Sequence, residues 1–172
     1  MIIRVSEIES ETKVKGVMEG SKFQDAEEET DVMFRAPAGY ELLVRKSGDI
    51  ISVKGPVSCV LTMMCSKCME DFALPIEAVL DVELVPKTLM PSESELELKG
   101  EDLDVCYYEG DEIDLDPFVY DEIMLNVPIK PVCMDGCKGL CEVCGANRNH
   151  EECRCSAAPH TLFGEKLKSF LN

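Results

Sequence analysis

Residues 133–155 read CMDGCKGLCEVCGANRNHEECRC and hold six of the ten cysteines in a chain of 172 residues. The second half of this stretch begins with Cys-Glu-Val-Cys (141–144) and ends with Cys-Arg-Cys (153–155). A Cys-x-x-Cys turn lets both sulfurs point to one centre while backbone N–H groups donate to the thiolates, and two close pairs suit tetrahedral zinc. Gly145 can adopt the left-handed conformation that follows the second sulfur. We therefore predict a zinc site formed by Cys141, Cys144, Cys153 and Cys155.

Four further cysteines could form a second zinc centre. Cys65 and Cys68 are a Cys-x-x-Cys pair in the front part of the chain, and Cys133 and Cys137 begin the tail stretch. Such a centre would join the tail to the front part through a metal. An alternative takes four ligands from the six tail cysteines in another combination and leaves Cys65 and Cys68 as a free or redox pair. The spacing leaves both open, with one or two zinc ions per chain.

The cysteine content and the start of the chain indicate a reducing compartment. The cysteine content, ten in 172 residues, is lower than the roughly 8–10% cysteine that is typical of secreted disulfide scaffolds. The opening residues MIIRVSEI lack the basic and long apolar parts of a signal peptide. No run approaches the roughly 18 apolar residues of a membrane span. We expect a cytoplasmic protein without a membrane partner, in which Cys59 and Cys106 are small buried side chains.

Charge divides the chain into an acidic front part and a neutral tail. The net charge is -17, and residues 1–125 carry 29 acidic and 11 basic side chains, whereas residues 126–155 carry four of each. Binding to phosphate backbones depends on Lys and Arg, so the front part favours a basic protein partner over nucleic acid. Direct RNA contact stays open for the tail. The basic residues available there are Lys130, Lys138, Arg148 and Arg154.

Short apolar runs separated by turn residues predict an antiparallel β meander in the front part. Residues 40–44 and 50–53 flank Ser-Gly-Asp (47–49), which predicts a hairpin. Gly-Pro at 55–56 predicts a break, and residues 57–64 predict a strand that ends at the first cysteine pair.

The next part of the chain predicts two more strands around an acidic loop. Residues 72–85 alternate between apolar and mostly polar side chains, which is typical of a half-buried strand. Residues 91–104 mix acidic side chains with turn formers and predict a surface loop, and residues 103–108 predict a further strand.

A helix is predicted near residues 116–126. Asp116 is suited to the N-cap and Pro117 to the first helical position, and Pro128 ends the pattern. The expected core-facing residues are Phe118, Ile123, Leu125 and Val127.

Together these elements predict an α+β chain in three parts. Residues 1–128 form an acidic, antiparallel β-rich domain with one or two short helices. Residues 129–158 form a cysteine-rich zinc module, and apolar residues at helical spacing predict a short amphipathic C-terminal helix over residues 159–172.

Motifs of common enzymes are absent from the sequence. It contains no Gly-rich phosphate loop, no Gly-x-Ser-x-Gly and no His-Glu-x-x-His, and its two histidines, His150 and His160, both lie in the tail. A closed four-sulfur zinc site leaves no open position for a substrate. We therefore expect a binding protein without catalytic activity. A thiol redox protein that uses Cys65 and Cys68 is the alternative from another class.

The motifs of the chain resemble those of the bacterial YceD family, whose members are described as large ribosomal RNA subunit accumulation proteins. The resemblance runs from about residue 50 to residue 155 in order. The matching segments are Gly-Pro-Val (55–57), CSKCME (65–70), GDEIDL (110–115), LNVPIKPVC (125–133) and CKGLCEVCGAN (137–147). Lys67 stands where an arginine is common in the family.

This resemblance implies a role in the accumulation or processing of large-subunit ribosomal RNA and in ribosome assembly. It also carries the cysteine motifs of the family onto all eight candidate zinc ligands. Combined with the acidic front part, it suggests a basic ribosomal protein or a ribosome assembly factor as the partner, reached through the acidic sheet or residues 91–104.

Overall fold

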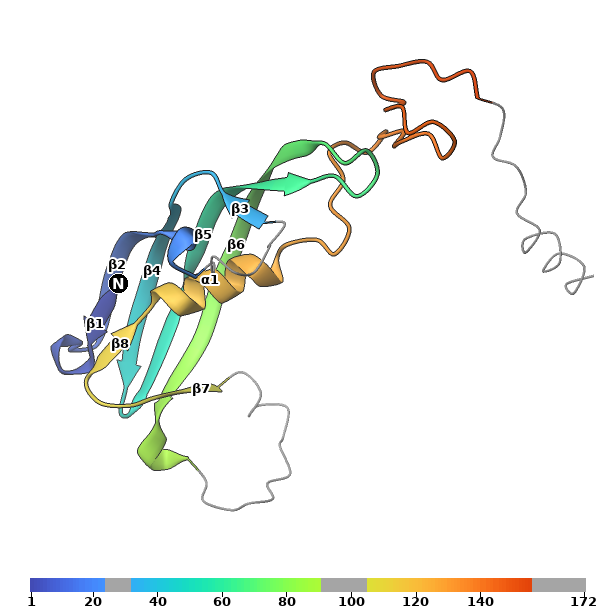
Figure 1. The fold of residues 1–172 in the computed structure, drawn as a ribbon. Helices are drawn as coiled ribbons and strands as arrows, with labels where there is room; N and C mark the ends of the chain where they lie inside the picture. The colour runs from blue at the N-terminus through green and yellow to red at the C-terminus, as the bar shows by residue number, and fades with distance from the viewer. Residues whose placement is uncertain (24–31, 91–104, 156–172) are drawn as a thin grey trace, which may run out of the picture. The chain divides into compact units, whose positions relative to one another are not determined.

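The computed structural model describes residues 1–23, 32–90 and 105–155 (Figure 1). The chain forms two compact units, one of Met1–Met63 with Ala73–Ile129 and one of Met64–Phe72 with Lys130–Asn172. The sheets and the helix belong almost entirely to the first unit, and the eight candidate ligands belong to the second. The predicted loop over residues 91–104 and the predicted C-terminal helix over residues 159–172 lie outside the described residues.

Six strands form the main sheet, in the order β2-β4-β5-β6-β7 with β3 paired to β5. They are β2 (Glu11–Met18), β3 (Val32–Phe34), β4 (Ala38–Ser47), β5 (Ile50–Met64), β6 (Asp71–Pro86) and β7 (Val105–Tyr108). Two short strands, β1 (Ile2–Arg4) and β8 (Glu112–Asp114), form a separate antiparallel ribbon. The 3-10 turns are η1 (Val5–Glu7), η2 (Gly20–Phe23) and η3 (Lys87–Leu89). The described part is therefore mostly β structure.

The predicted hairpin is confirmed, and the predicted break after it is wrong. Gly48, with φ 63°, and Asp49 connect β4 to β5. β5 then continues through Gly55 and Pro56, and β4 keeps one register with β5 on both sides of this pair. A Cβ on Gly55 would collide with the backbone oxygen of Glu41. Glycine is needed here because it lets two backbones approach closely, and not because the strand ends.

Alternating burial along β6 confirms the predicted half-buried strand. Its even-numbered residues from Ile76 to Leu84 are buried, whereas Glu77, Asp81 and Glu83 are exposed. β4 and β5 show the same alternation, so one face of the sheet supplies most of the core.

One strand departs from the predicted antiparallel arrangement. β7 pairs with β6 in parallel, from Glu83 opposite Val105 to Pro86 opposite Tyr108. A parallel pair needs a connection of a dozen residues or more, and residues 87–104 provide one. β7 therefore pairs with the last four residues of β6.

The predicted helix is present as α1 (Asp116–Leu125), but its cap and its buried face differ from expectation. Leu115 occupies the N-cap, Asp116 is the first helical residue, and its backbone N–H donates to Asp114 Oδ1 at 3.2 Å. The fully buried residues are Leu115, Val119 and Ile123, which are spaced four apart. Leu125, expected in the core, is 81% exposed. The buried stripe thus begins one residue before the helix.

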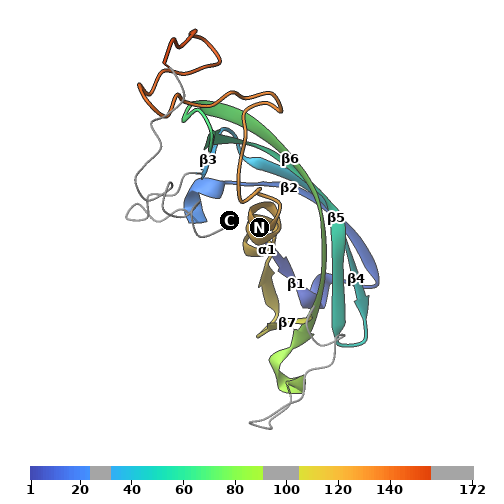
Figure 2. The ribbon, with the colours of Figure 1, turned by 90° about the vertical axis from the view of Figure 1, so that its right-hand side faces the viewer.

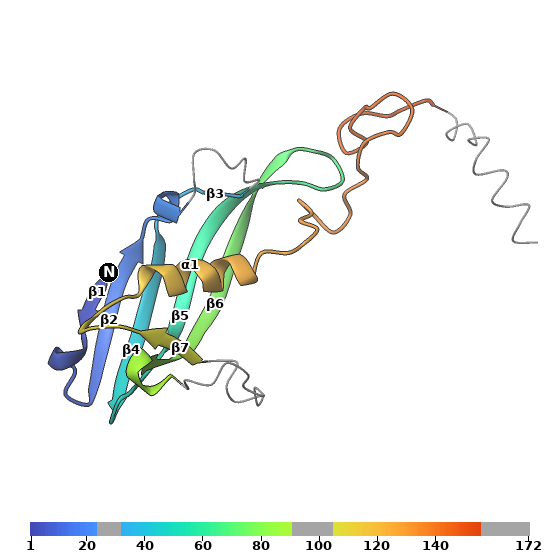
Figure 3. The same cartoon turned by 60° about the horizontal axis from the view of Figure 1, so that its bottom comes forward.

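α1 lies on the concave side of the curved sheet, as Figure 2 shows, and crosses its strands in Figure 3. Tyr120 stacks on Phe23 with ring centroids 4.9 Å apart. Tyr40 is buried, and its hydroxyl lies 3.4 Å from Asp116 Oδ1. Burial and the nearby Asp116 carboxylate raise the pKa of Tyr40 to about 12. Within the described ranges, no helix has the length and apolar character needed to cross a membrane.

Replacement of Gly55 by Ala tests the close approach of β4 and β5. The added methyl would collide with the backbone of Glu41, so Gly55→Ala should lower the free energy of unfolding by about 1–3 kcal/mol. Gly39→Ala in β4 is the control, because a Cβ there would meet only Ser58 Oγ at 4.0 Å. Urea unfolding measures both variants, and equal stability of the two would contradict the close approach.

Candidate metal centres

Two groups of four cysteines lie in the second unit, and in each group all sulfur atoms are within 4.8 Å of one another. Centre I consists of Cys65, Cys68, Cys133 and Cys137, and centre II of Cys141, Cys144, Cys153 and Cys155. The structure therefore brings all eight candidate residues together in the two-centre arrangement. The alternative, in which the six tail cysteines combine differently and leave Cys65 and Cys68 as a free or redox pair, differs from this grouping. No other group of this kind occurs among the residues that the structure describes.

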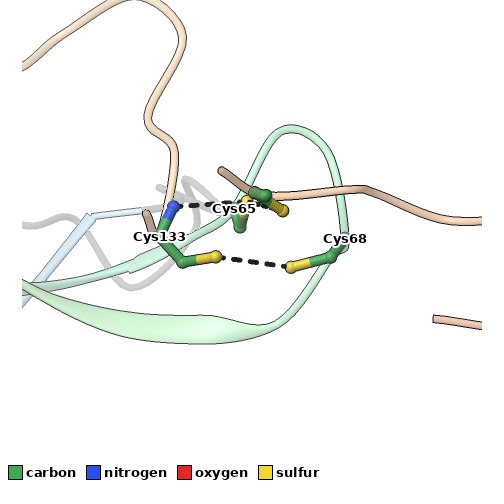
Figure 4. A group of neighbouring side chains, drawn as sticks. Cys65, Cys68 and Cys133 are labelled. Carbon is green, nitrogen blue, oxygen red and sulfur yellow. Dashed lines mark hydrogen bonds between the residues drawn. The ribbon is translucent and has the colours of Figure 1, made fainter. Parts of the chain in front are cut away.

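Centre I combines two segments that are far apart in the sequence (Figure 4). Cys65 and Cys68 lie in the turn between β5 and β6, and Cys133 and Cys137 lie in the chain that follows α1. The turn is closed by a hydrogen bond from the N–H of Met69 to the Cys65 carbonyl oxygen at 3.0 Å. Met69 has φ 61°, a left-handed conformation that is uncommon for a residue with a side chain. A second backbone bond runs from Ser66 N–H to the carbonyl oxygen of Pro131 at 2.8 Å.

The sulfur spacing in centre I fits a tetrahedral zinc ion. Sγ of Cys65 lies 3.8 Å from Sγ of Cys137, and Sγ of Cys68 lies 3.7 Å from Sγ of Cys133. Zinc–sulfur bonds of about 2.3 Å place tetrahedral ligands about 3.8 Å apart. A disulfide would need about 2.05 Å. The donor set and its spacing therefore suit zinc and not a pair of disulfides.

Centre I is largely buried, and its thiols differ in acidity. Burial opposes ionisation of Cys65, but hydrogen bonds from the backbone N–H groups of Cys133 and Cys68 outweigh it and lower the pKa of this thiol to about 6. Burial and the neighbouring thiols raise the pKa of Cys133 to about 12. Four thiolates this close repel one another unless a cation lies between them. A divalent metal would remove this conflict.

Centre II has similar spacing but more exposure. Sγ of Cys153 lies 3.6 Å from Sγ of Cys144 and 3.2 Å from Sγ of Cys141, and Cys144 and Cys155 are exposed. Backbone N–H groups of Cys144 and then Val143 lower the pKa of Cys141 to about 6. Hydrogen bonds with Cys153 and Cys144 raise the pKa of Cys155 to about 12.

Gly145 has the left-handed conformation predicted for the residue after the second sulfur of centre II, with φ 74°. Its N–H donates to the Cys141 carbonyl oxygen at 2.8 Å, and the N–H of Cys141 donates to the Ala146 carbonyl oxygen at 2.8 Å. These bonds hold the backbone in a tight turn around the first pair of centre II.

Asn149, which lies between the cysteines, contacts centre I, and His150 contacts Glu70 beside it; the sequence motifs predicted neither contact. Asn149 Nδ2 lies 3.3 Å from Sγ of Cys137, and His150 Nε2 lies 3.0 Å from Glu70 Oε1. The Asn149 amide lowers the pKa of Cys137. Asparagine and histidine are common in polar turns, so the sequence carries no signal for these contacts. His160 lies outside the described residues.

The two cysteines outside the centres behave differently. Cys59 on β5 is buried as predicted, and burial raises the pKa of its thiol to about 11. Cys106 on β7 is only half-buried, because it lies on an edge strand, so the prediction of burial was too strong there. Burial and then the charge of Asp121 raise the pKa of Cys106.

A family model described as "Large ribosomal RNA subunit accumulation protein YceD" matches residues 53–171, which include all eight clustered cysteines. The chain belongs to the YceD family. The resemblance inferred from the sequence motifs is thereby confirmed. No solved structure matches the chain.

Named relatives in plants support this membership. The chain is similar to the chloroplastic large ribosomal RNA subunit accumulation protein YCED homolog 1 of Zea mays, with 28% identity over 155 residues, which cover 76% of this chain and 52% of the maize protein. The Arabidopsis thaliana homolog of the same name is 40% identical over 47 residues, or 27% of this chain and 15% of that protein.

An uncharacterized protein of Mycobacterium tuberculosis is 29% identical over 105 residues, which cover 61% of this chain and 48% of that protein. The chain spans about half the length of the maize and mycobacterial relatives.

Gly139 of this YceD-family chain packs against Lys67, which lies in the turn of Cys65 and Cys68. Its replacement tests the packing of the tail segment against this turn. Its φ is 69°, and a Cβ would lie 2.9 Å from the Lys67 carbonyl oxygen, which accepts the Leu140 N–H. Gly139→Ala should cost about 1–2 kcal/mol for the left-handed backbone alone. Faster hydrogen exchange at the Leu140 amide would report the loss. Gly136→Ala, with open space around the Cβ, should leave that amide protected, and equal exchange in both variants would contradict the packing.

Proposed function

We propose that this protein is a non-enzymatic zinc-binding factor that acts in the accumulation and processing of large-subunit ribosomal RNA. The observation that carries this proposal is the presence of two four-sulfur groups inside the region that matches the YceD family. The family name supports the link to ribosomal RNA, and the donor sets support zinc. Reduced thiolate ligands also favour a cytoplasmic location, because a reducing compartment keeps them available to metal.

In this proposal zinc has a structural role. Each centre supplies four sulfurs, so a bound ion has no open position for a substrate, and its chemistry is to balance the thiolate charges and stabilise the fold. The chain would use centre I to fix the β5–β6 turn against the segment after α1, and centre II to close the turn at Gly145. The alternative redox use of Cys65 and Cys68 is disfavoured because both sulfurs lie at ligand spacing from other cysteines.

Metal analysis tests this role directly. Protein purified without added metal should contain about two zinc ions per chain, and Cys144→Ser should reduce this to about one, because one ligand of centre II is lost. Cys106→Ser is the control, since Cys106 lies outside both centres. Atomic emission gives the stoichiometry. A folded wild-type protein without zinc would overturn the proposal.

The partner proposed for the acidic part is a basic ribosomal protein or a ribosome assembly factor. Several acidic side chains of the sheet are already neutralised, such as Glu41 by Lys15 and Glu11 by Arg45. Glu77 and Glu83 on β6 are exposed and have no ion pair with another described residue. They remain available to attract a basic surface.

Charge removal on β6 tests this partner class. Glu77→Gln with Glu83→Gln should weaken binding to basic ribosomal proteins about fivefold at low salt, which corresponds to roughly 0.5 kcal/mol for each exposed charge. Glu11→Gln with Glu41→Gln changes the net charge equally but removes paired carboxylates, so its effect should be smaller. Pull-down and titration at two salt concentrations measure the difference. Equal effects of the two double variants would exclude a specific role for β6.

Direct RNA binding is the second candidate, favoured by one observation in the second unit. Lys130, Lys138, Arg148 and Arg154 are exposed and form no ion pair within the described ranges. A binding constant for ribosomal RNA that falls steeply with salt, and falls further when these four residues are replaced, would support this candidate over the protein partner.

A further inference from the structure

The loop between the two cysteine pairs of centre II also contacts centre I. Its ends are Cys144 and Cys153, both of centre II, and between them Asn149 reaches to 3.3 Å from Sγ of Cys137 in centre I. The Asn149 side chain therefore lies against centre I, while the loop that carries it is anchored at both ends to centre II. The contact lies entirely within the second unit.

The orientation of the Asn149 amide follows from its other partner. The backbone N–H of Lys138 lies 2.8 Å from Asn149 Oδ1. A backbone N–H can only donate, so the atom that faces it must be the amide oxygen. The NH2 group then faces Cys137 and donates to its sulfur.

Further contacts hold this loop against both chain segments of centre I. The N–H of Arg148 donates to the Gly139 carbonyl oxygen at 3.0 Å, two residues after Cys137. His150 Nε2 lies 3.0 Å from an oxygen of Glu70, two residues after Cys68. The loop is thus positioned to transmit a change at its own ends to the ligands of centre I.

We propose that Asn149 is a positioning residue that couples the two centres, so that zinc at centre II strengthens zinc binding at centre I. This inference rests on the proposed function, because it requires both centres to bind zinc. With an ion at centre II, Cys144 and Cys153 hold the ends of the loop together, and Asn149 stays against Cys137. Without that ion the ends separate, and the thiolate of Cys137 loses its donor. Coupling between two binding sites is reciprocal, so centre I strengthens centre II by the same factor.

Zinc competition with a chromophoric chelator, applied to the full chain, tests the coupling. Loss of a hydrogen bond to a metal ligand typically weakens metal binding about 10- to 100-fold. Asn149→Ala should therefore lower the affinity of the chain for one of its two zinc ions about tenfold or more. Asn149→Asp, which keeps the acceptor for Lys138 but places a negative charge at the sulfur, should weaken it at least as much. Asn126→Ala is the control, because this exposed asparagine ends α1 and contacts no cysteine.

Variants with a single centre separate coupling from local disruption. In Cys68→Ser, which leaves centre II, Asn149→Ala should not change the remaining affinity. In Cys144→Ser, which leaves centre I, the affinity should already be reduced about tenfold, and Asn149→Ala should then add little. With cobalt(II) in place of zinc, Asn149→Asp should shift the sulfur-to-metal absorption of centre I, which a loss of packing alone would not do.

Three results would overturn the coupling. The first is unchanged zinc affinity in Asn149→Ala. The second is equal weakening of centre I by Asn149→Ala with and without Cys144→Ser. The third is weakening of centre II by Asn149→Ala in Cys68→Ser, which would mean that the substitution only disorders the loop. A wild-type chain that binds no zinc would instead overturn the proposed function.

Discussion

Four thiolates within 4.8 Å of one another repel strongly unless a cation lies among them. This constraint governs the second unit, because among its described residues the buried cluster is formed mainly by cysteines. Its buried cluster consists of cysteines of centre I with Phe72 and Val132 packed against it. A metal ion would supply the stabilising energy that a larger domain obtains from a hydrophobic core. In the first unit the sheet and α1 bury an apolar core instead.

Local patterns were sufficient to predict a large part of this molecule. The spacing of the cysteines predicted the four members of centre II and offered centre I as one of two alternatives, and alternation of apolar residues predicted β6. Both signals depend on residues close in sequence. The prediction of a break at Gly55–Pro56 was wrong because glycine is required there by the close approach of the Glu41 backbone, which lies on another strand. The parallel pairing of β7 and the contact of Asn149 with Cys137 likewise depend on partners that are distant in the chain.

The two units differ in how their charges are used. On the sheet, basic side chains such as Lys15, Arg45 and Lys54 form ion pairs with acidic neighbours, and the acidic excess remains. Exposed ion pairs of this kind add little stability. Their main effect is to neutralise some carboxylates of the sheet and not others. In the second unit, exposed basic and acidic side chains are nearly balanced in number. The arrangement of atoms around the sulfurs therefore affects the stability of that unit more than its net charge does.

The ribbon of β1 and β8 has a consequence for synthesis of the chain. Ile2 pairs with Asp114 and Arg4 with Glu112, so β1 must wait during translation for the synthesis of more than a hundred later residues. At about 5–20 residues per second this delay lasts roughly 5–20 seconds. Throughout that interval β1 lacks the strand with which it pairs in the folded protein, so this pairing can form only after β8 has left the exit tunnel.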